Sequence, residues 1–319
     1  MNRHLDILCI GTALVDSIIK GFDPHPVSDA GFRAASGSLN VGGEAVNEAM
    51  AAAKLGAKTA ILCSLGIDGA GQMIEDALVR CRVDTSRIVR SEEHPTPVTT
   101  MFVNDDGTRK SITNGSHRYN FHPERYAACL QEAGAVILGS LFRAPFDDPE
   151  VIRAVLRAAK ASELTVFADT KLPNYRFLRL DDIADSLPLI DYITPNEDEA
   201  KYYTGKSDPE EMADVFLERG VKNVIVKLGG RGCFYKGSRG CISLPAWTVH
   251  AVDATGAGDN FIAGLASEIL RGKTVEEALR FANACGAICT TAVGAGTALR
   301  SREQVAAFMK ESSGVEREI

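Results

Sequence analysis

The chain has 319 residues, of which 45% are hydrophobic, so it is long enough to bury a large core and is ordinary for a globular protein. Its formal net charge is −7 and the sequence holds no Lys/Arg run, which argues against a nucleic-acid-binding surface. No apolar run approaches membrane-spanning length, and the first residues lack the apolar core of a signal peptide. We therefore expect a cytoplasmic protein with no membrane contact.

Eight cysteines are spread along the chain without a Cys-x-x-Cys pair and without the Cys/His spacing of a zinc site. Several lie inside apolar runs. We expect buried free thiols in a reducing compartment.

Short apolar runs alternate with longer helical patterns along the sequence. Strands are expected at 5–10, 59–65, 135–138, 164–168, 192–194 and 224–226, and helices at 44–55, 73–81, 149–161, 197–203, 209–219, 257–270, 275–290 and 302–310. This alternation predicts an α/β fold with a mainly parallel sheet covered by helices on both faces, whose ligands sit beyond the carboxyl ends of the strands. No repeat or linker appears, so we expect a single domain over residues 1–319.

Two segments do not fit the alternation. Residues 17–41 are rich in Gly, Pro and Ser, and residues 96–117 are typical of extended chain with a tight turn at 104–107. The apolar residues of 98–103 need a partner surface, because a lone hairpin is marginal in water. We expect the two segments to form a small extra sheet; surface decoration is the alternative.

The most informative stretch is 253–261, which reads Asp-Ala-Thr-Gly-Ala-Gly-Asp-Asn-Phe before a helical run. Residues Gly256, Ala257 and Gly258 let backbone N–H groups converge, and the helix adds its positive end. Such a nest stabilises negative charge that develops in a reaction, while Asp259 at its rim can take a proton from a hydroxyl. The alternative is a glycine-rich loop with Asp259 as a helix cap.

Three further motifs accompany this stretch in chain order. They are Asn-Val-Gly-Gly-Glu-Ala-Val-Asn at 40–47 with Leu-Gly-Ile-Asp-Gly-Ala-Gly at 65–71, Pro-Asn-Glu-Asp-Glu-Ala at 195–200, and Val-Lys-Leu-Gly-Gly-Arg-Gly at 226–232. Together the four resemble the signature motifs of the ribokinase, or PfkB, family of carbohydrate kinases over residues 11–296. The resemblance implies a three-layer ribokinase-like fold with a small β lid built from about 17–41 and 96–117. It also implies ATP, Mg²⁺ and a sugar as ligands, and a homodimer formed through the lids.

On the sugar side, the resemblance makes Asp16 a carboxylate that accepts hydrogen bonds from neighbouring sugar hydroxyls; a surface turn residue is the alternative. Gly42 and Gly43 allow the backbone to approach a ligand closely, and Asn47 offers both a donor and an acceptor. Asp259 would deprotonate the sugar hydroxyl.

On the nucleotide side, Asn196 and Glu199 share one face at a helix start, where the resemblance makes them organise Mg²⁺ and its waters around the ATP phosphates. A helix cap is the alternative for Asn196. The resemblance further places four residues along the nucleotide: Lys227, Gly229, Gly232 and Asn283.

A potassium site of some relatives aligns with Asp253, Thr255 and backbone carbonyls near Cys289, Ala292 and Gly294. Ala298 stands where some relatives have serine, which departs from that pattern.

Other nucleotide folds are disfavoured. The one Gly-Lys-Thr, at 272–274, has Ser267 where a phosphate loop of the Walker type needs glycine, and no Gly-x-Gly-x-x-Gly follows the first strand.

The substrate is the least specified feature. We expect a free pentose or hexose, with a nucleoside or an acidic sugar such as 2-keto-3-deoxygluconate as alternatives, and a non-catalytic sugar-binding relative as a different class. The sequence does not assign roles to Arg109, Arg143 and Lys171, which would suit an anionic sugar but also suit structural charges.

Overall fold

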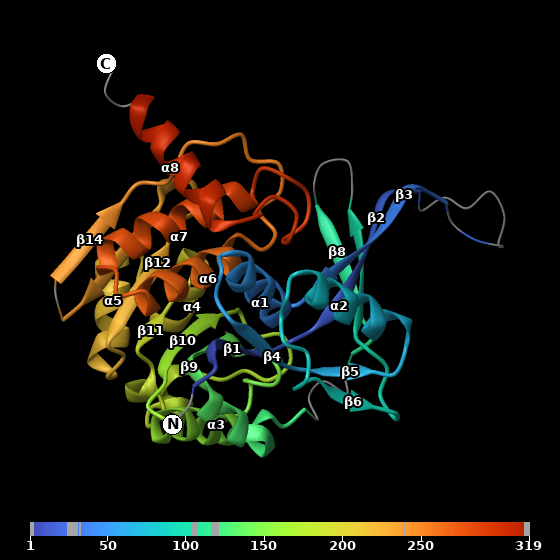
Figure 1. Ribbon diagram of the computed structural model, residues 1–319, viewed down its shortest axis with the longest axis horizontal. Coiled ribbons are helices and arrows are strands. Elements are labelled where there is room, and N and C mark those ends of the chain that lie inside the picture. Colours follow the sequence, from blue (N-terminus) through green and yellow to red (C-terminus); the bar gives the residue numbers. More distant parts are fainter. Residues whose placement is uncertain are drawn as a thin grey trace.

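The computed structural model describes residues 3–23, 31, 33–103, 108–115, 121–238 and 240–315 (Figure 1). Its centre is an eight-stranded sheet. The strand order is β14 (Gly240–Leu244), β13 (Cys233–Gly237), β12 (Asn223–Lys227), β11 (Tyr192–Ile193), β10 (Thr165–Thr170), β9 (Ala133–Leu141), β1 (Leu5–Gly11) and β4 (Thr59–Leu62). The six strands from β12 to β4 run parallel, and β13 and β14 form an antiparallel edge.

Helices cover both faces of this sheet, as predicted. One face carries α1 (Glu44–Lys54), α2 (Gly69–Arg80), α6 (Ala257–Leu270), α7 (Val275–Cys289) and α8 (Arg302–Val315). The other carries α3 (Pro149–Ala161), α4 (Glu197–Thr204) and α5 (Pro209–Glu218). Each face of the sheet has its own hydrophobic core, and alternate residues of β1 pack into the two. Ile7 and Cys9 pack on the first face, and Leu8 and Ile10 pack on the second. A strand buried on both faces needs such a continuous apolar run.

A second sheet of four strands stands apart from the body of the molecule (Figure 1). Its order is β3 (Arg33–Gly42), β2 (Leu14–Asp23), β7 (Val98–Val103) and β8 (Arg109–Thr113), with β2 and β7 parallel and both outer pairs antiparallel. The two irregular segments therefore pair with each other. The turn expected at 104–107 lies outside the described residues.

The motif at 65–71 links this small sheet to the body. The predicted strand 59–65 divides into β4 and β5 (Ser64–Gly66), and β5 pairs with β6 (Val89–Ser91). Asp68 caps α2 through Gly71 N at 2.8 Å and also accepts from Thr96 N at 2.7 Å. Thr96 Oγ1 accepts from Gly66 N at 2.9 Å. Thr96, two residues before β7, is thus held by the helix cap.

Short 3₁₀ segments occur at η2 (Pro123–Glu132), η3 (Leu180–Ile183), η4 (Leu187–Leu189) and η5 (Gly229–Arg231). Among the described residues, no helix is both long and apolar enough to cross a membrane.

Candidate active site

Two neighbouring cavities share part of their lining, and the larger includes residues at the carboxyl ends of the central strands. The larger, of about 940 Å³, runs from α1 past the ends of β10 and β12 to α6 and α7, and we call it the cleft. The smaller, of about 410 Å³, lies against β2, β3 and β7 of the small sheet, and we call it the chamber. Both are lined by Asp16, Asn47, Asp253 and Thr255, so these residues mark their junction.

Asp259 lies in the first turn of α6 and lines the cleft. The helix opens from Gly256, which has a φ of +78° and whose Cα faces Ala295 so closely that a Cβ would lie 2.1 Å from the Ala295 Cβ. Only glycine fits there. The amide of Ala257 donates to Ala254 O at 3.2 Å, and Gly258 lies in the same turn. Amides at the start of a helix have no partner within the helix, so this turn is suited to an anion.

The Asp259 carboxylate is 5% exposed, and its Oδ2 accepts a hydrogen bond from Asn47 Nδ2 at 2.7 Å. Burial raises the pKa of Asp259 to about 6, while the Lys171 ammonium and the Asn47 amide act in the opposite direction. A carboxylate with this pKa is ionised at neutral pH and basic enough to accept a proton from a reacting hydroxyl.

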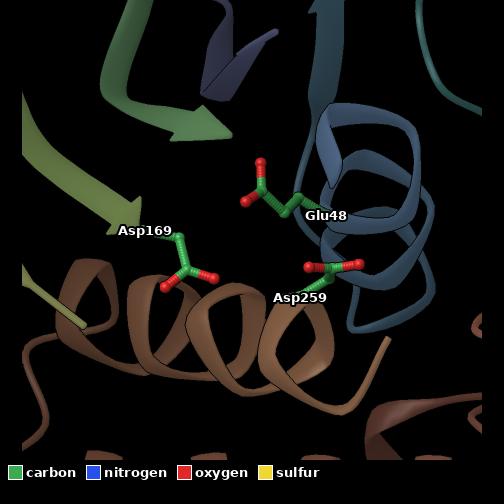
Figure 2. Close-up of side chains that lie close together, drawn as sticks. All are labelled: Glu48, Asp169 and Asp259. Atoms are coloured by element: carbon green, nitrogen blue, oxygen red, sulfur yellow. The ribbon is translucent and has the colours of Figure 1, made fainter. Parts of the chain in front are cut away.

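Asp259 belongs to a buried acidic cluster with Glu48 and Asp169, whose carboxylate oxygens lie within 4.8 Å of one another (Figure 2). Asp169 Oδ1 accepts from Lys227 Nζ at 2.7 Å and from Thr194 Oγ1 at 2.9 Å. Burial and the neighbouring Asp259 raise the pKa of Glu48 well above its ordinary value.

Neither Glu48 nor Asp169 stands among the predicted site residues. The signal for Glu48 is weak, because a single Glu inside an Ala-rich helix reads as a solvated residue. Asp169 follows an apolar strand run, so its place at a strand end was a usable signal.

Asn196 and Glu199 form a capping box at the start of α4. Glu199 N donates to Asn196 Oδ1 and Asn196 N donates to Glu199 Oε2, each at 2.9 Å. Glu199 is 4% exposed, also accepts from Thr170 Oγ1 at 2.8 Å, and has a pKa raised by burial. Both residues line the cleft. The expected cap is therefore present.

The remaining nucleotide-side residues line the same cleft. Lys227 is held in its ion pair with Asp169, its side chain 13% exposed. Gly229 has a φ of +58° with open space around its Cα, whereas Gly232 packs against Leu244 O, 2.0 Å from where a Cβ would lie. Asn283 Nδ2 donates weakly to Pro245 O at 3.4 Å.

On the chamber side, Asp16 of β2 packs directly against Gly42. A Cβ on Gly42 would lie 2.4 Å from Asp16 Oδ2, and one on Gly43, whose φ is +97°, would lie 2.4 Å from Thr12 O. The glycine pair therefore makes room for the Asp16 carboxylate and for the chain reversal into α1.

The five residues of the predicted cation site lie on two neighbouring segments, one before α6 and one at the end of α7 and beyond it. Asp253 Oδ1 accepts from Thr255 Oγ1 at 2.7 Å, and its Oδ2 accepts from Gly294 N at 2.9 Å. The Cys289 thiol donates to Thr255 O at 3.4 Å, and Ala292 lies in the turn before Gly294.

Of the three basic residues without an assigned role, Lys171 lines the cleft 3.8 Å from Glu44. Arg143 donates to Leu172 O and so fixes the backbone after Lys171. The side chain of Arg109 lies outside the described part of the chain.

Comparison with known proteins agrees with this geometry. Residues 5–302 match the family model described as pfkB family carbohydrate kinase. The chain is 29% identical to ribokinase of Haemophilus influenzae over 276 residues, covering 85% of this chain and 88% of the relative. It is 32% identical to fructokinase-2 of Oryza sativa subsp. japonica over 288 residues, covering 81% of each.

Among solved structures, Arabidopsis thaliana ribokinase complexed with ribose and ATP superposes with a TM-score of 0.84 at 27% identity, covering 96% of this chain and 99% of that one. The expected ribokinase-like fold is confirmed. A match over nearly the whole length shows that the chain belongs to the pfkB family of carbohydrate kinases, which are phosphotransferases acting on sugar hydroxyls.

Proposed function

We propose that the protein transfers the γ-phosphoryl group of ATP to a primary hydroxyl of a free pentose or hexose, with Asp259 as the base. The observation that carries this is the hydrogen bond between Asp259 and Asn47, because Asn47 lines both the cleft and the chamber. The base therefore lies where a sugar in the chamber would meet a phosphate in the cleft. ATP and ribose in the Arabidopsis relative support the two ligand classes.

In this mechanism Asp259 takes the hydroxyl proton as the sugar oxygen forms a bond to the γ-phosphorus. The bond from that phosphorus to the β–γ bridging oxygen breaks, and ADP leaves with the electron pair. The amides of Gly256 and Gly258 at the start of α6 would stabilise the developing negative charge, and the Ala257 amide, which donates to Ala254 O, holds the turn. Asn196 and Glu199 would hold Mg²⁺ through its waters, and the ion would neutralise phosphate charge. Gly229, Gly232 and Asn283 would line the nucleotide.

The chamber supports a free sugar as substrate. Asp16, Asn40 and Asn47 provide polar groups suited to hydroxyls, and none of the described residues that line it is aromatic. A nucleoside base would favour an aromatic stacking partner, so a nucleoside is the less favoured alternative. An acidic sugar such as 2-keto-3-deoxygluconate is favoured by one observation, Lys20 at the chamber wall.

An ADP-release assay with ribose, fructose, 2-keto-3-deoxygluconate and adenosine tests this proposal. We expect ADP to form with a neutral sugar and Mg²⁺. Sugar binding without ADP release from any of the four would support the non-catalytic alternative and contradict the proposal.

We further propose that the chain acts as one kinase domain, with the four-stranded sheet as a lid that closes over the chamber and excludes water. Its outer strands expose Leu39 (60%) and Ile112 (69%), which suits a homodimer through the lids. Sedimentation at micromolar concentration checks the dimer, and a monomer would exclude it.

We propose that a potassium ion activates turnover by binding beside five residues: Asp253, Thr255, Cys289, Ala292 and Gly294. Oxygen-rich loops suit a large monovalent ion. Turnover in potassium buffer should exceed turnover in sodium buffer, and equal rates would contradict this site.

A further inference from the structure

The backbone of Lys171 is fixed at the end of β10. Lys171 N donates to Leu141 O at 3.1 Å, and Lys171 O accepts from the Tyr203 hydroxyl at 2.7 Å. Tyr203 is in turn stacked on Phe142 with 4.0 Å between ring centroids. These contacts hold the backbone of Lys171 at the wall of the cleft and do not involve its ammonium group.

The ammonium itself is only loosely tethered. Its ion pair with Glu44 Oε1 measures 3.8 Å, beyond a hydrogen bond, and the side chain is 36% exposed. Lys227 differs, since it bonds Asp169 at 2.7 Å with 13% of its side chain exposed. Lys171 can therefore change partners at little cost, whereas Lys227 would leave a buried carboxylate unpaired.

The lining of the cleft carries more negative than positive side chains, so a mobile cation would help a phosphate to bind. The described lining carries six carboxylates and two lysines: Asp16, Glu44, Asp169, Glu199, Asp253 and Asp259 against Lys171 and Lys227. A triphosphate that enters brings further negative charge next to Asp259. Mg²⁺ at the Asn196–Glu199 end would offset part of it, but the phosphoryl group must approach the Asp259 end.

We infer that Lys171 is a catalytic residue whose ammonium leaves Glu44 to bind the phosphoryl group during its transfer from ATP to the sugar. This rests on the proposed kinase function and adds to it a residue to which the sequence assigned no role. No proton moves to or from Lys171. Burial alone would lower its pKa, but Glu44 and Asp259 raise it above its ordinary value, so the ammonium stays charged at neutral pH.

A second consequence concerns the base. Several polar or charged groups surround Asp259: Glu44, Asn47 and Glu48 on α1, Asp169 at the end of β10, Lys171 just after it and Cys289 on α7. Lys227 from β12 is ion-paired with Asp169. Lys171 lowers the pKa of Asp259, so losing its charge should raise that pKa above about 6.

The direct test is nucleotide binding by the full chain with Mg²⁺, measured by calorimetry for ADP and for the β,γ-imido analogue of ATP. Lys171→Met should weaken binding of the analogue by about 10- to 100-fold, the range for a hydrogen bond to a charged group, and leave ADP unchanged. Lys171→Arg should keep part of the preference. Lys236→Met is the matched control, because Lys236 is ion-paired with Glu210 and Asp214 outside the cleft.

Turnover gives the second readout. Lys171→Met should lower kcat by about 10²–10³-fold with little change in the sugar KM, as for loss of one group that binds the transferring charge. The acid limb of its kcat/KM profile should move to higher pH. Equal loss of ADP and analogue binding, or unchanged binding of both, would overturn the inference, with thermal melting to show that each variant is folded.

The two proposals fail separately. If the wild-type protein releases no ADP with any sugar, the proposed function fails, while the binding comparison still decides whether Lys171 contacts the γ-phosphate. If the wild-type protein is active and Lys171→Met retains its kcat, only the inference on Lys171 fails.

Discussion

Asn47 donates a 2.7 Å hydrogen bond to Asp259 across 212 positions of sequence, and this bond joins the starts of two helices, α1 and α6. One helix follows the glycine pair beside Asp16, and the other follows the Gly-Ala-Gly turn. The bond therefore fixes the proposed base relative to both the chamber and the cleft. Because the Asn47 amide stabilises the ionised carboxylate, it also holds the pKa of Asp259 below the value that burial alone would impose.

Asn47→Ala should therefore raise the pKa of Asp259. A lost hydrogen bond to a charged group corresponds to an upward shift on the order of one pKa unit. The ascending limb of the kcat/KM profile should move from about pH 6 toward 7, since the base must be ionised. Asn223→Ala, which removes an amide bonded to Asp191 O outside the cleft, is the control. An unmoved limb would contradict the role of Asn47.

Asp259 should make the protein less stable at neutral pH than it would be without the charge. Its pKa is about 6 in the folded protein against an ordinary value of 3.8, so between these values the folded state binds more protons than the unfolded chain. The free energy of unfolding therefore decreases as the pH rises through this window, by about 3 kcal/mol in total. Asp259→Asn should be more stable than wild type at pH 7.5, and the gap should close near pH 4.

Urea unfolding of both proteins from pH 4 to 8 measures this difference. A variant that is less stable than wild type at pH 7.5 would show that the buried charge is better compensated than its surroundings indicate.

Glu199→Gln should raise the Mg²⁺ concentration needed for half-maximal turnover and lower kcat, while sugar binding stays nearly unchanged. The side-chain oxygen of Gln can still accept the Asn196 N–H, so the capping box and the stability of the protein should be largely kept. Glu277→Gln is the matched control, because Glu277 forms the same kind of capping box with Thr274 at the start of α7, outside the lining of the cleft. It should keep similar stability with the Mg²⁺ requirement intact. An effect of Glu199→Gln on sugar affinity alone would place the metal elsewhere.

Gly42→Ala should raise the sugar KM by about tenfold or more and leave the nucleotide KM nearly unchanged. The new Cβ would lie 2.4 Å from Asp16 Oδ2 and must push that carboxylate aside. Gly37→Ala in the same strand is the control, because its Cβ would meet nothing closer than Ile18 O at 3.9 Å. Normal sugar affinity in Gly42→Ala would contradict the assignment of Asp16 to the sugar.

The sequence predicted those elements whose ends carry strong local signals. The bounds of α3 and α6 agree with the prediction, because Asp148 and Pro149 open the first and the Gly-Ala-Gly turn opens the second. The edge strands β13 and β14 were missed, since short, partly exposed strands beside glycines lack a clear period. The helix α2 begins four residues before the prediction, at Gly69, because the Asp68 cap offsets two glycines.

The motif residues that line the cleft could be picked out from the sequence because each motif is local. What could not be read is which charges meet across the fold. Glu48 lies close to Asp259, and Lys171 lies close to Glu44, although the two members of each pair come from different elements. Burial and proximity of this kind arise from tertiary packing, so the electrostatics of the cleft needed the structure.

The role of Asp259 as the base of a sugar kinase is tested most directly by ADP release from Asp259→Asn with the sugar that the wild-type protein prefers. Asparagine keeps the shape and the contact with Asn47 but cannot accept the proton. A positioned base contributes about 10²–10⁴-fold, so turnover should fall by that factor while ATP binding persists. Turnover close to that of the wild-type protein would contradict the account.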